Sequence, residues 1–580
     1  MTPYPQSSDT DHWTLRVFFL LILLMVGCHH GPDLPPSTEA RSSSNRSAEA
    51  LGTEGQAELR TIVEAGTLAD LRWADFSDYQ DDVAKFYETY DRALPWVRDM
   101  QPTPQARATI ALLQNADEKG LVAEDYDGSR WSERLRHLKP TARSPKPSDL
   151  VHFDVALTVS AMRYISDLHI GRVNPRHLNF AVDTAARRYN LPEFLREDVV
   201  DASNVPDILR QVEPPYPGYQ RTIRALSRYR EIAREDNDGD LSAIKSPTKL
   251  GDLYPDVQRL SRLLVLLGDL QQSDVRPDET AYRGPLVDAV KNFQKRHGLT
   301  ADGQIDSHTL MELNVPVPSR IRQMELTLER WRWLPDDYQH SSIVVNIPEF
   351  RLRAYDDQFR IAVTMNVVVG KAYGHSTPVF MNKMQYVTFR PYWNVPPSIA
   401  RAEIIPSLER NSAYLTQENM DVVDAHENVV ASGEITDDML QDVRRGKLSF
   451  RQRPGPTNSL GLIKFMFPNE YDIYMHDTPA TELFSKSRRD FSHGCIRLEK
   501  PVDLAVWVLR DNPGWTNDRI RAAMNGTQTE DVHLTHPISV LIVYGTVIVS
   551  EDGVVHFYDD IYQHDAALEQ ALGQGYPYPR

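Results

Sequence analysis

Cysteine is almost absent from this sequence, because its 580 residues include only Cys28 and Cys495. So few cysteines exclude a fold that is held together by a framework of disulfides. Long basic runs are also missing, and the formal net charge is −17, so we expect no nucleic-acid partner. With 41% hydrophobic residues, a chain of this length is expected to fold into several globular domains.

One long hydrophobic run is present, from Val17 to Cys28. It is shorter than the about 20 residues that cross a bilayer as a helix, and it fits the apolar part of an export signal. The letters MVGC at its end resemble a bacterial lipobox, in which the cysteine is lipidated and begins the mature chain. An uncleaved N-terminal anchor is the alternative. Residues 1–28 therefore predict an exported protein that contacts a membrane only through this anchor or through a lipid on Cys28.

After the hydrophobic run, a polar segment is followed by a long segment with apolar residues at helical spacing. Residues 29–55 are rich in Ser, Pro, Gly and Glu and lack apolar periodicity, which predicts a disordered tether. From 56 to 248 apolar residues recur at spacings of three and four, which predicts a helical scaffold domain. Its clearest helices are expected over 81–90, 104–121 and 150–168, with Gly120 and Gly171 at helix ends.

Residues 250–316 predict a compact unit of three helices. The first ends near Gly268, the second is closed by Gly298, and the third is opened by Asp306, in agreement with the usual capping residues. This pattern resembles the three-helix peptidoglycan-binding module, and the resemblance implies binding of glycan or stem peptide. The residues that carry it are Ala289-Val290, Phe293-Gln294, Gly298-Leu299, Asp302-Gly303 and Thr309-Leu310.

Residues 317–570 begin with a helical connector and then become rich in β-branched and aromatic residues, which predicts a mainly antiparallel sheet domain. Residues 400–455 are helical and polar in pattern, and we expect them to be an insertion that caps a site. A late helix over 503–512 and a hairpin that turns at Asp552-Gly553 follow. The chain as a whole is thus predicted to be a multidomain α+β protein. Strands are expected within 341–355, 359–370, 383–396, 461–469 and 471–477.

Cys495 is the candidate for chemistry, in the stretch FSHGCIRLEKP. A free thiol with a pKa of about 8.5 is mostly protonated at neutral pH, so a nucleophilic cysteine needs a neighbouring base. His476 and His493 are both candidates, and spacing does not choose between them. Gly494 permits a tight turn in which the amides of Gly494 and Cys495 face an oxyanion. The alternative role for Cys495 is that of a small buried hydrophobe.

Asp477 suggests a Cys-His-Asp triad, because it follows His476 directly. Successive side chains of a strand point to opposite faces, however. The carboxylate of Asp477 is therefore poorly placed to orient His476.

Two motifs in the C-terminal part resemble the signature of the L,D-transpeptidases with a YkuD-type catalytic domain: HDTP, from His476 to Pro479, and SHGCIRLEKP, from Ser492 to Pro501. The stretches VVNIPEFRLRAY, VVVGKAYGHSTPVF, YWNVPPSIA and PGPTNSLGLIKFMFPN resemble other strands of that domain. A helical scaffold, a peptidoglycan-binding module and a capping insertion together resemble the large periplasmic branch of the family, over about residues 75 to 570.

The resemblance implies a reaction. Cys495 would attack the carbonyl of the third residue of a tetrapeptide stem, release the terminal D-alanine and hold the acyl group as a thioester, which an amine of a second stem resolves. His476 would be the general base, oriented through the main-chain carbonyl of Asp477. His493, Gly494, Cys495 and Tyr474 would line the oxyanion site. No metal and no cofactor is implied, and the partners would be donor and acceptor stem peptides in the periplasm.

Three further residues are candidates for substrate contact. Arg497 stands where the family often has Asn, and it would form either a structural ion pair or a contact to a substrate carboxylate. Trp393 would form an apolar wall of the donor site or pack in a core. Ser492 would contact substrate or hold the turn with its hydroxyl.

Two other functions compete with a transpeptidase. A carboxypeptidase would resolve the same thioester with water and trim tetrapeptides, and the residues of the two enzymes are almost identical. A wall-binding scaffold without catalysis is disfavoured because His476 and Cys495 are both present. A papain-like protease is disfavoured because the cysteine does not come early in the chain.

Overall fold

The computed structural model describes residues 48–139, 145–236, 238–335, 342–372 and 374–579. The predicted signal at residues 1–28, with its lipidated Cys28, lies outside the described residues, as does most of the predicted tether. Within the described ranges, no helix has both the length and the apolar character that a membrane crossing requires.

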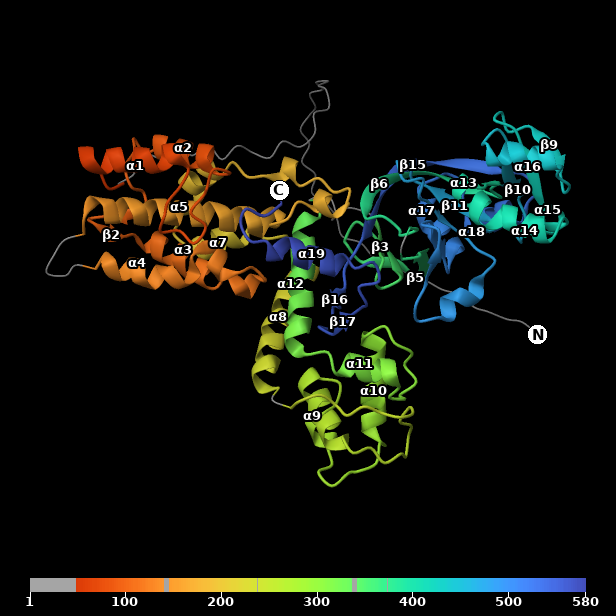
Figure 1. Ribbon diagram of the computed structural model, residues 1–580, viewed down its shortest axis with the longest axis horizontal. Helices are drawn as coiled ribbons and strands as arrows, with labels where there is room; N and C mark the ends of the chain where they lie inside the picture. Colours follow the sequence, from red (N-terminus) through yellow and green to blue (C-terminus); the bar gives the residue numbers. More distant parts are fainter. Residues whose placement is uncertain (1–47, 140–144, 237, 336–341, 373, 580) are drawn as a thin grey trace, which may run out of the picture. The chain divides into compact units, whose positions relative to one another are not determined.

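The first described part is helical, as predicted. Its long helix α5 is buried along almost its whole length and lies among the helices around it (Figure 1). Gly120 and Gly171 end helical segments as expected. The helices are α1 (Thr53–Ala65), α2 (Gln80–Glu88), α3 (Pro104–Gln114), α4 (Trp131–His137), α5 (Pro147–Ile170), α6 (Leu191–Phe194), α7 (Val205–Arg210) and α8 (Pro217–Glu235), with a short pair of strands, β1 (Val97–Arg98) and β2 (Gln101–Pro102).

The predicted tether is wrong at its C-terminal end. Helix α1 begins at Thr53, and the backbone of Glu49 is hydrogen-bonded to that of Leu94 in both directions. Leu59 and Ile62 of the helix are buried. Burial of the apolar residues of this helix thus orders the C-terminal end of the polar segment 29–55.

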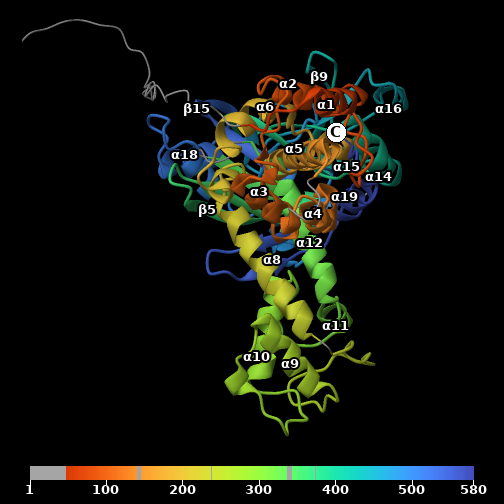
Figure 2. The same cartoon turned by 90° about the vertical axis from the view of Figure 1, so that its left-hand side faces the viewer.

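The three-helix unit is confirmed as α9 (Val257–Leu267), α10 (Pro285–Arg296) and α11 (Ser307–Leu313). Gly268 caps α9 with a φ of 86°, and the Asp306 carboxylate accepts the N–H of Thr309 at 2.7 Å. Helix α12 (Val317–Trp333) follows and runs beside α8 in both views (Figure 2). Arg230 of α8 and Glu325 of α12 form an ion pair at 3.1 Å, which ties the two helices together.

The C-terminal part is built on a nine-stranded sheet that is mainly antiparallel, as predicted. Its order is β13-β5-β14-β12-β11-β6-β15-β3-β4, and a further pairing of β4 with β5 closes it on itself. Three pairings are parallel: β13 with β5, β12 with β14, and β15 with β3. The strands are β3 (Ser342–Asn346), β4 (Arg351–Tyr355), β5 (Ile361–Gly370), β6 (Phe380–Phe389), β11 (Ile463–Met466), β12 (Met475–His476), β13 (Asp490–Ser492), β14 (Ile496–Leu498) and β15 (Glu530–Val543).

One face of this sheet forms the core, through residues such as Val387, Phe465, Met475 and Ile496. Helices α17 (Pro501–Val508) and α18 (Asn517–Asn525) also contribute to that core. Because side chains alternate along a strand, the neighbours of these residues point to the opposite face. That opposite face carries the candidate site.

The insertion between β6 and β11 is only partly helical, so the prediction of a helical insertion is wrong in this respect. It contains a four-stranded sheet of order β7-β10-β8-β9, with short strands in which Val422 and Phe450 pair and are fully buried. Paired β-branched and aromatic residues favour strands even in a polar segment. The elements are β7 (Trp393–Asn394), α13 (Pro397–Ile399), a π-helical turn (Ala400–Ile404), α14 (Ile405–Arg410), α15 (Tyr414–Gln417), β8 (Met420–Val423), β9 (Val429–Ser432), α16 (Asp437–Arg444) and β10 (Ser449–Gln452).

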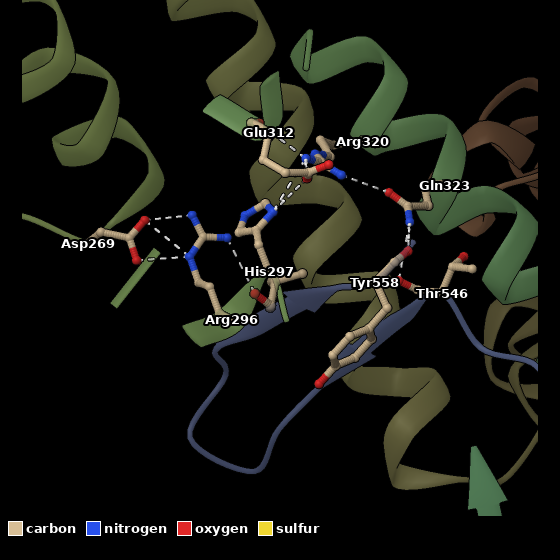
Figure 3. Close-up of polar contacts among 9 residues, drawn as sticks. Asp269, Arg296, His297, Glu312, Arg320, Gln323, Thr546 and Tyr558 are labelled. Atoms are coloured by element: carbon tan, nitrogen blue, oxygen red, sulfur yellow. Dashed lines mark hydrogen bonds and ion pairs between the residues drawn. The ribbon is translucent and has the colours of Figure 1, made fainter. Parts of the chain in front are cut away.

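The C-terminal hairpin, β16 (Val547–Val549) and β17 (Val555–Phe557), contacts the three-helix unit and α12 (Figure 3). Gly553 has the positive φ of the predicted turn. Arg296 of α10 is paired with Asp269 at 2.6 Å and reaches the main-chain oxygen of Val555. The amide of Gln323 donates to the main-chain oxygens of Thr546 and Tyr558. The last helix, α19 (His564–Gly573), follows the hairpin.

Candidate active site

Two short parallel strands bring the sequence motifs together. In the pairing of β12 with β14, His476 lies opposite Arg497, and the Ile496 N–H donates to the main-chain oxygen of Tyr474 at 3.0 Å. Met475 and Ile496 point into the core. Alternation therefore places Tyr474 and His476 on the same face as Cys495 and Arg497.

His476 is buried and held in one orientation by the main chain. Its Nδ1 lies 2.5 Å from the main-chain oxygen of Asp477. A carbonyl oxygen only accepts hydrogen bonds, so Nδ1 carries the proton and Nε2 carries the free lone pair. Burial, followed by the positive charge of Arg497, lowers the pKa of His476 to about 3. The imidazole is therefore neutral at pH 7.

The carboxylate of Asp477 points away from His476, as the strand geometry predicts. It accepts the N–H of Leu462 at 2.8 Å and that of Thr478 at 2.8 Å. Gly461 makes room for it: a Cβ atom on this glycine, whose φ is +62°, would lie 2.4 Å from the Asp477 carboxyl carbon. Asp477 therefore faces His476 through its carbonyl group, and its side chain fastens the neighbouring loop.

Cys495 is partly exposed, and its sulfur lies 3.8 Å from the main-chain oxygen of Asp472. Burial raises the pKa of the Cys495 thiol, whereas hydrogen bonds with Tyr474 and the charge of Lys464 lower it. Burial dominates, so the resting thiol is protonated at neutral pH. A nucleophilic attack then requires transfer of that proton to a base.

The turn before Cys495 is held by two buried hydroxyl groups. The Ser492 hydroxyl donates to the main-chain oxygen of Cys495 at 2.5 Å and accepts the N–H of Gly494 at 3.1 Å. The Thr377 hydroxyl donates to the Gly494 oxygen at 2.7 Å, and Gly494 has a φ of +118°. The Gly494 amide is therefore occupied here, contrary to the expectation that it faces an oxyanion. The placement of Ser492 favours the role of holding the turn over contact with substrate.

The two histidines have different surroundings. The Nε2 of His493 lies 2.8 Å from the carboxylate of Glu403, and its ring lies edge to face with that of His375. Burial lowers the pKa of His493 and the Glu403 charge raises it. His493 is paired with a carboxylate, whereas the Nε2 of His476 forms no hydrogen bond with the residues that the structure describes. The geometry therefore favours His476 as the base.

Glu403 is a site residue that sequence reasoning missed. It comes from the π-helical turn Ala400–Ile404 of the insertion, and its contact with His493 brings the insertion to the cysteine turn. No motif surrounds it in the sequence. Its role depends on how the insertion folds back, which local pattern does not report.

Arg497 is half-buried, and its guanidinium group has no direct counter-ion among the described residues. Burial lowers its pKa, while the charges of Cys495, Glu403 and Glu482 raise it. Its Nε is buried without a hydrogen-bond partner, and no ion pair to Arg497 is formed within the described ranges of the chain. Of the two roles left open, this placement favours contact with a substrate carboxylate.

Trp393 lies where the insertion meets the site. It belongs to β7, which pairs with β10, and it packs against the core of the insertion. Burial raises the pKa of Tyr474, and a hydrogen bond with the Trp393 side chain acts in the opposite direction. Trp393 therefore contacts both the insertion core and a site residue.

Lys464 is a second residue that sequence reasoning missed. It lies opposite His476 in the pairing of β11 with β12, and its Nζ is 3.9 Å from the centre of the Tyr474 ring. The signal was available, because a lysine inside the apolar stretch GLIKFMF is unusual for a buried strand.

A group of potential metal ligands occurs elsewhere among the described residues. His308, Glu312 and Asp559 have ligand atoms within 4.8 Å of one another, and Glu312 is already paired with Arg320 and His297. None of the candidate site residues belongs to this group.

Three family models match the chain in the predicted order. Residues 340–533 match the model described as "L,D-transpeptidase catalytic domain" (YkuD), residues 254–313 match "Putative peptidoglycan binding domain", and residues 81–226 match "Scaffold domain". A protein of Haemophilus influenzae named "Putative L,D-transpeptidase" is 30% identical over 294 residues. That alignment covers 49% of this chain and 58% of the relative, so the chain spans little more than half of the relative's length.

Proposed function

Because the chain carries an L,D-transpeptidase catalytic domain of the YkuD family, we propose that it joins peptidoglycan stem peptides through a thioester on Cys495. The sulfur attacks the carbonyl of the third residue of a tetrapeptide stem. The new sulfur–carbon bond replaces the bond to the terminal D-alanine, which leaves as a free amino acid. An amine of a second stem then displaces the sulfur and forms the cross-link.

The observation that carries this proposal is the neutral, oriented His476 on the same sheet face as Cys495. Its Nε2 accepts the thiol proton as the sulfur attacks, and the imidazolium returns that proton to the departing amine. The Asp477 carbonyl, which accepts the Nδ1 proton, stabilises the imidazolium between these steps. No cofactor takes part in this sequence.

Arg497 supplies the proposed substrate contact, and the insertion supplies the proposed cover of the site. Arg497, whose charge lacks a direct partner in the described part of the chain, binds the terminal carboxylate of the donor stem. Trp393, through Tyr474, and Glu403, through His493, connect the insertion to the site. In the proposed reaction the insertion caps the bound stem, and a capped site excludes water and favours an amine as acceptor, in keeping with a transpeptidase rather than a carboxypeptidase.

The setting of this reaction follows from the match to a peptidoglycan-binding domain, which points to the cell envelope. We propose export to the periplasm and attachment through a lipid on Cys28.

The test is mass spectrometry of a disaccharide-tetrapeptide incubated with the full chain and, in parallel, with Cys495→Ala. A cross-linked dimer that has lost one D-alanine, and that is absent with the variant, is the expected result. A tripeptide without any dimer would identify a carboxypeptidase. The same products from both proteins would exclude Cys495 as the nucleophile.

A further inference from the structure

Lys464 places a positive charge on the face of the sheet that carries Cys495. Residues directly opposite each other in neighbouring strands share a face, and Lys464 is opposite His476. Its Nζ lies 3.9 Å from the centre of the Tyr474 ring, which is a close cation–π contact. Tyr474 lies beside the cysteine turn, because its main-chain oxygen accepts the Ile496 N–H at 3.0 Å, and its hydrogen bonds lower the pKa of the Cys495 thiol. Lys464, Tyr474 and Cys495 thus form a continuous series.

A structural role for this lysine finds little support in its surroundings. Its neighbours Ile463 and Phe465 are fully buried, so Lys464 keeps a cation in an apolar strand at a cost in desolvation. No salt bridge to Lys464 is formed in the parts of the chain that the structure describes. Asp531 of β15 lies on the same face, because Thr388 is opposite both Lys464 and Asp531, and its carboxylate accepts the Thr388 hydroxyl at 2.6 Å.

The charged groups around the sulfur come from several elements. Lys464 reaches it from β11, Arg497 from β14, and Asp472 from the loop before β12. Burial lowers the pKa of Lys464, whereas the charges of Cys495, Asp531 and Asp472 raise it. The same lysine lowers the pKa of His476. Lys464 therefore favours a charged sulfur and a neutral imidazole, which is the pair of states that attack and leaving-group release require.

We propose that Lys464 and Tyr474 act as one unit that stabilises the Cys495 thiolate. The lysine draws electron density from the phenol ring, which makes the Tyr474 O–H a stronger hydrogen-bond donor to the sulfur. Tyr474 keeps its proton throughout, and the thiol proton passes to His476 Nε2. Lys464 acts through Tyr474 and by its charge, so it is a positioning residue. This inference rests on the proposed function only in taking Cys495 as the nucleophile.

The test measures the thiol directly and needs no peptidoglycan. In the full chain with Cys28→Ser, Cys495 is the only thiol, and its alkylation by iodoacetamide is followed by intact mass between pH 6 and 10. Lys464→Met is expected to raise the thiol pKa by about one unit, which slows alkylation at pH 7 about tenfold. Lys464→Arg is expected to restore the rate to within about threefold.

Two comparisons separate this effect from a general loss of charge or fold. Lys383→Met removes an exposed lysine of β6 in the same sheet and is expected to leave the thiol pKa unchanged. Lys464→Met and Tyr474→Phe are expected to be non-additive, because both remove the same hydrogen-bonding unit. Lys464→Gln replaces Lys464→Met if thermal unfolding shows that the latter is destabilised.

The inference would be overturned if a folded variant without the Lys464 charge kept the wild-type pKa of the Cys495 thiol. It would also be overturned if Lys464→Met and Tyr474→Phe shifted that pKa by fully additive amounts. A shifted pKa together with no thioester or cross-linked product would leave this inference standing and overturn the proposed reaction.

Discussion

The Nδ1 of His476 is hydrogen-bonded to the main-chain oxygen of Asp477, the next residue in the chain, at 2.5 Å. The Asp477 carboxylate meanwhile accepts two main-chain N–H groups on its other side. The orientation of His476 thus depends on the main-chain carbonyl of Asp477 and only indirectly on the Asp477 carboxylate.

Asp477→Asn is therefore expected to retain most of the activity of the folded protein. The amide loses one of the two accepted hydrogen bonds, so stability falls by about 1–2 kcal/mol. A true triad would instead lose about 10⁴-fold in kcat. Steady-state kinetics together with thermal unfolding distinguish the two, and a fall of that size in folded protein would contradict the carbonyl contact.

His476 is expected to impose no acid limb on kcat/KM near neutrality. Its pKa of about 3 means that the free imidazole is the main form at every pH above about 4. The measurement is kcat/KM for a tetrapeptide between pH 4.5 and 8. A loss of activity that follows a single group with a pKa of 6 to 7, and that shifts in a variant of His476, would contradict this expectation.

Gly461→Ala is expected to disturb the site through Asp477. The added Cβ would lie 2.4 Å from the Asp477 carboxyl carbon, so the carboxylate must move and release the Leu462 and Thr478 amides. Gly446→Ala is the matched control, because Gly446 has a φ of +75° but an empty surrounding. In both variants, backbone strain is expected to lower the free energy of unfolding by about 1 kcal/mol. Only Gly461→Ala is expected to lower kcat as well. Equal kinetics for the two would contradict this steric account.

Arg497→Met is expected to weaken binding of the donor stem about 10- to 150-fold, which corresponds to about 1.5–3 kcal/mol for a charged hydrogen bond. A tetrapeptide whose terminal D-alanine is amidated serves as the paired substrate. The wild-type protein is expected to bind this amidated substrate more weakly than the tetrapeptide, by a similar factor. Arg497→Met is expected to bind the two substrates almost equally. If the substitution and the amidation instead weaken binding independently, so that their factors multiply, Arg497 does not bind that carboxylate.

Asp154 in helix α5 is expected to make the scaffold less stable at high pH. Burial raises its pKa from 3.8 to about 8, against hydrogen bonds from Tyr87 and Trp96 that lower it. The folded state therefore binds the proton more tightly than the unfolded state. The stabilisation is complete below about pH 4 and is lost as the pH rises to about 8.

Asp154→Asn removes this titration, so its urea midpoint is expected to change less than that of the wild type between pH 5 and 8. Glu88→Gln, at the exposed end of α2, is the control and keeps the wild-type dependence. An Asp154→Asn chain with the full wild-type pH dependence would show that another group is responsible.

Much of the site could be read from local pattern. Alternation along the strand at 475–477 is enough to turn the Asp477 carboxylate away from His476, and the structure has this arrangement. The same pattern did not reveal that the Gly494 amide is occupied by Ser492, because that bond depends on the shape of the turn.

The sequence by itself determined the helix ends, the strand faces and the position of a single thiol beside two histidines. These features depend on residues within a few positions of one another, where propensity and periodicity act. Only the tertiary structure decided that β4 and β5 close the sheet, that Glu403 reaches His493, and that Lys464 lies on the Tyr474 ring. Those contacts join segments distant in the chain, and they exist because burial of several apolar faces at once fixes which segments meet.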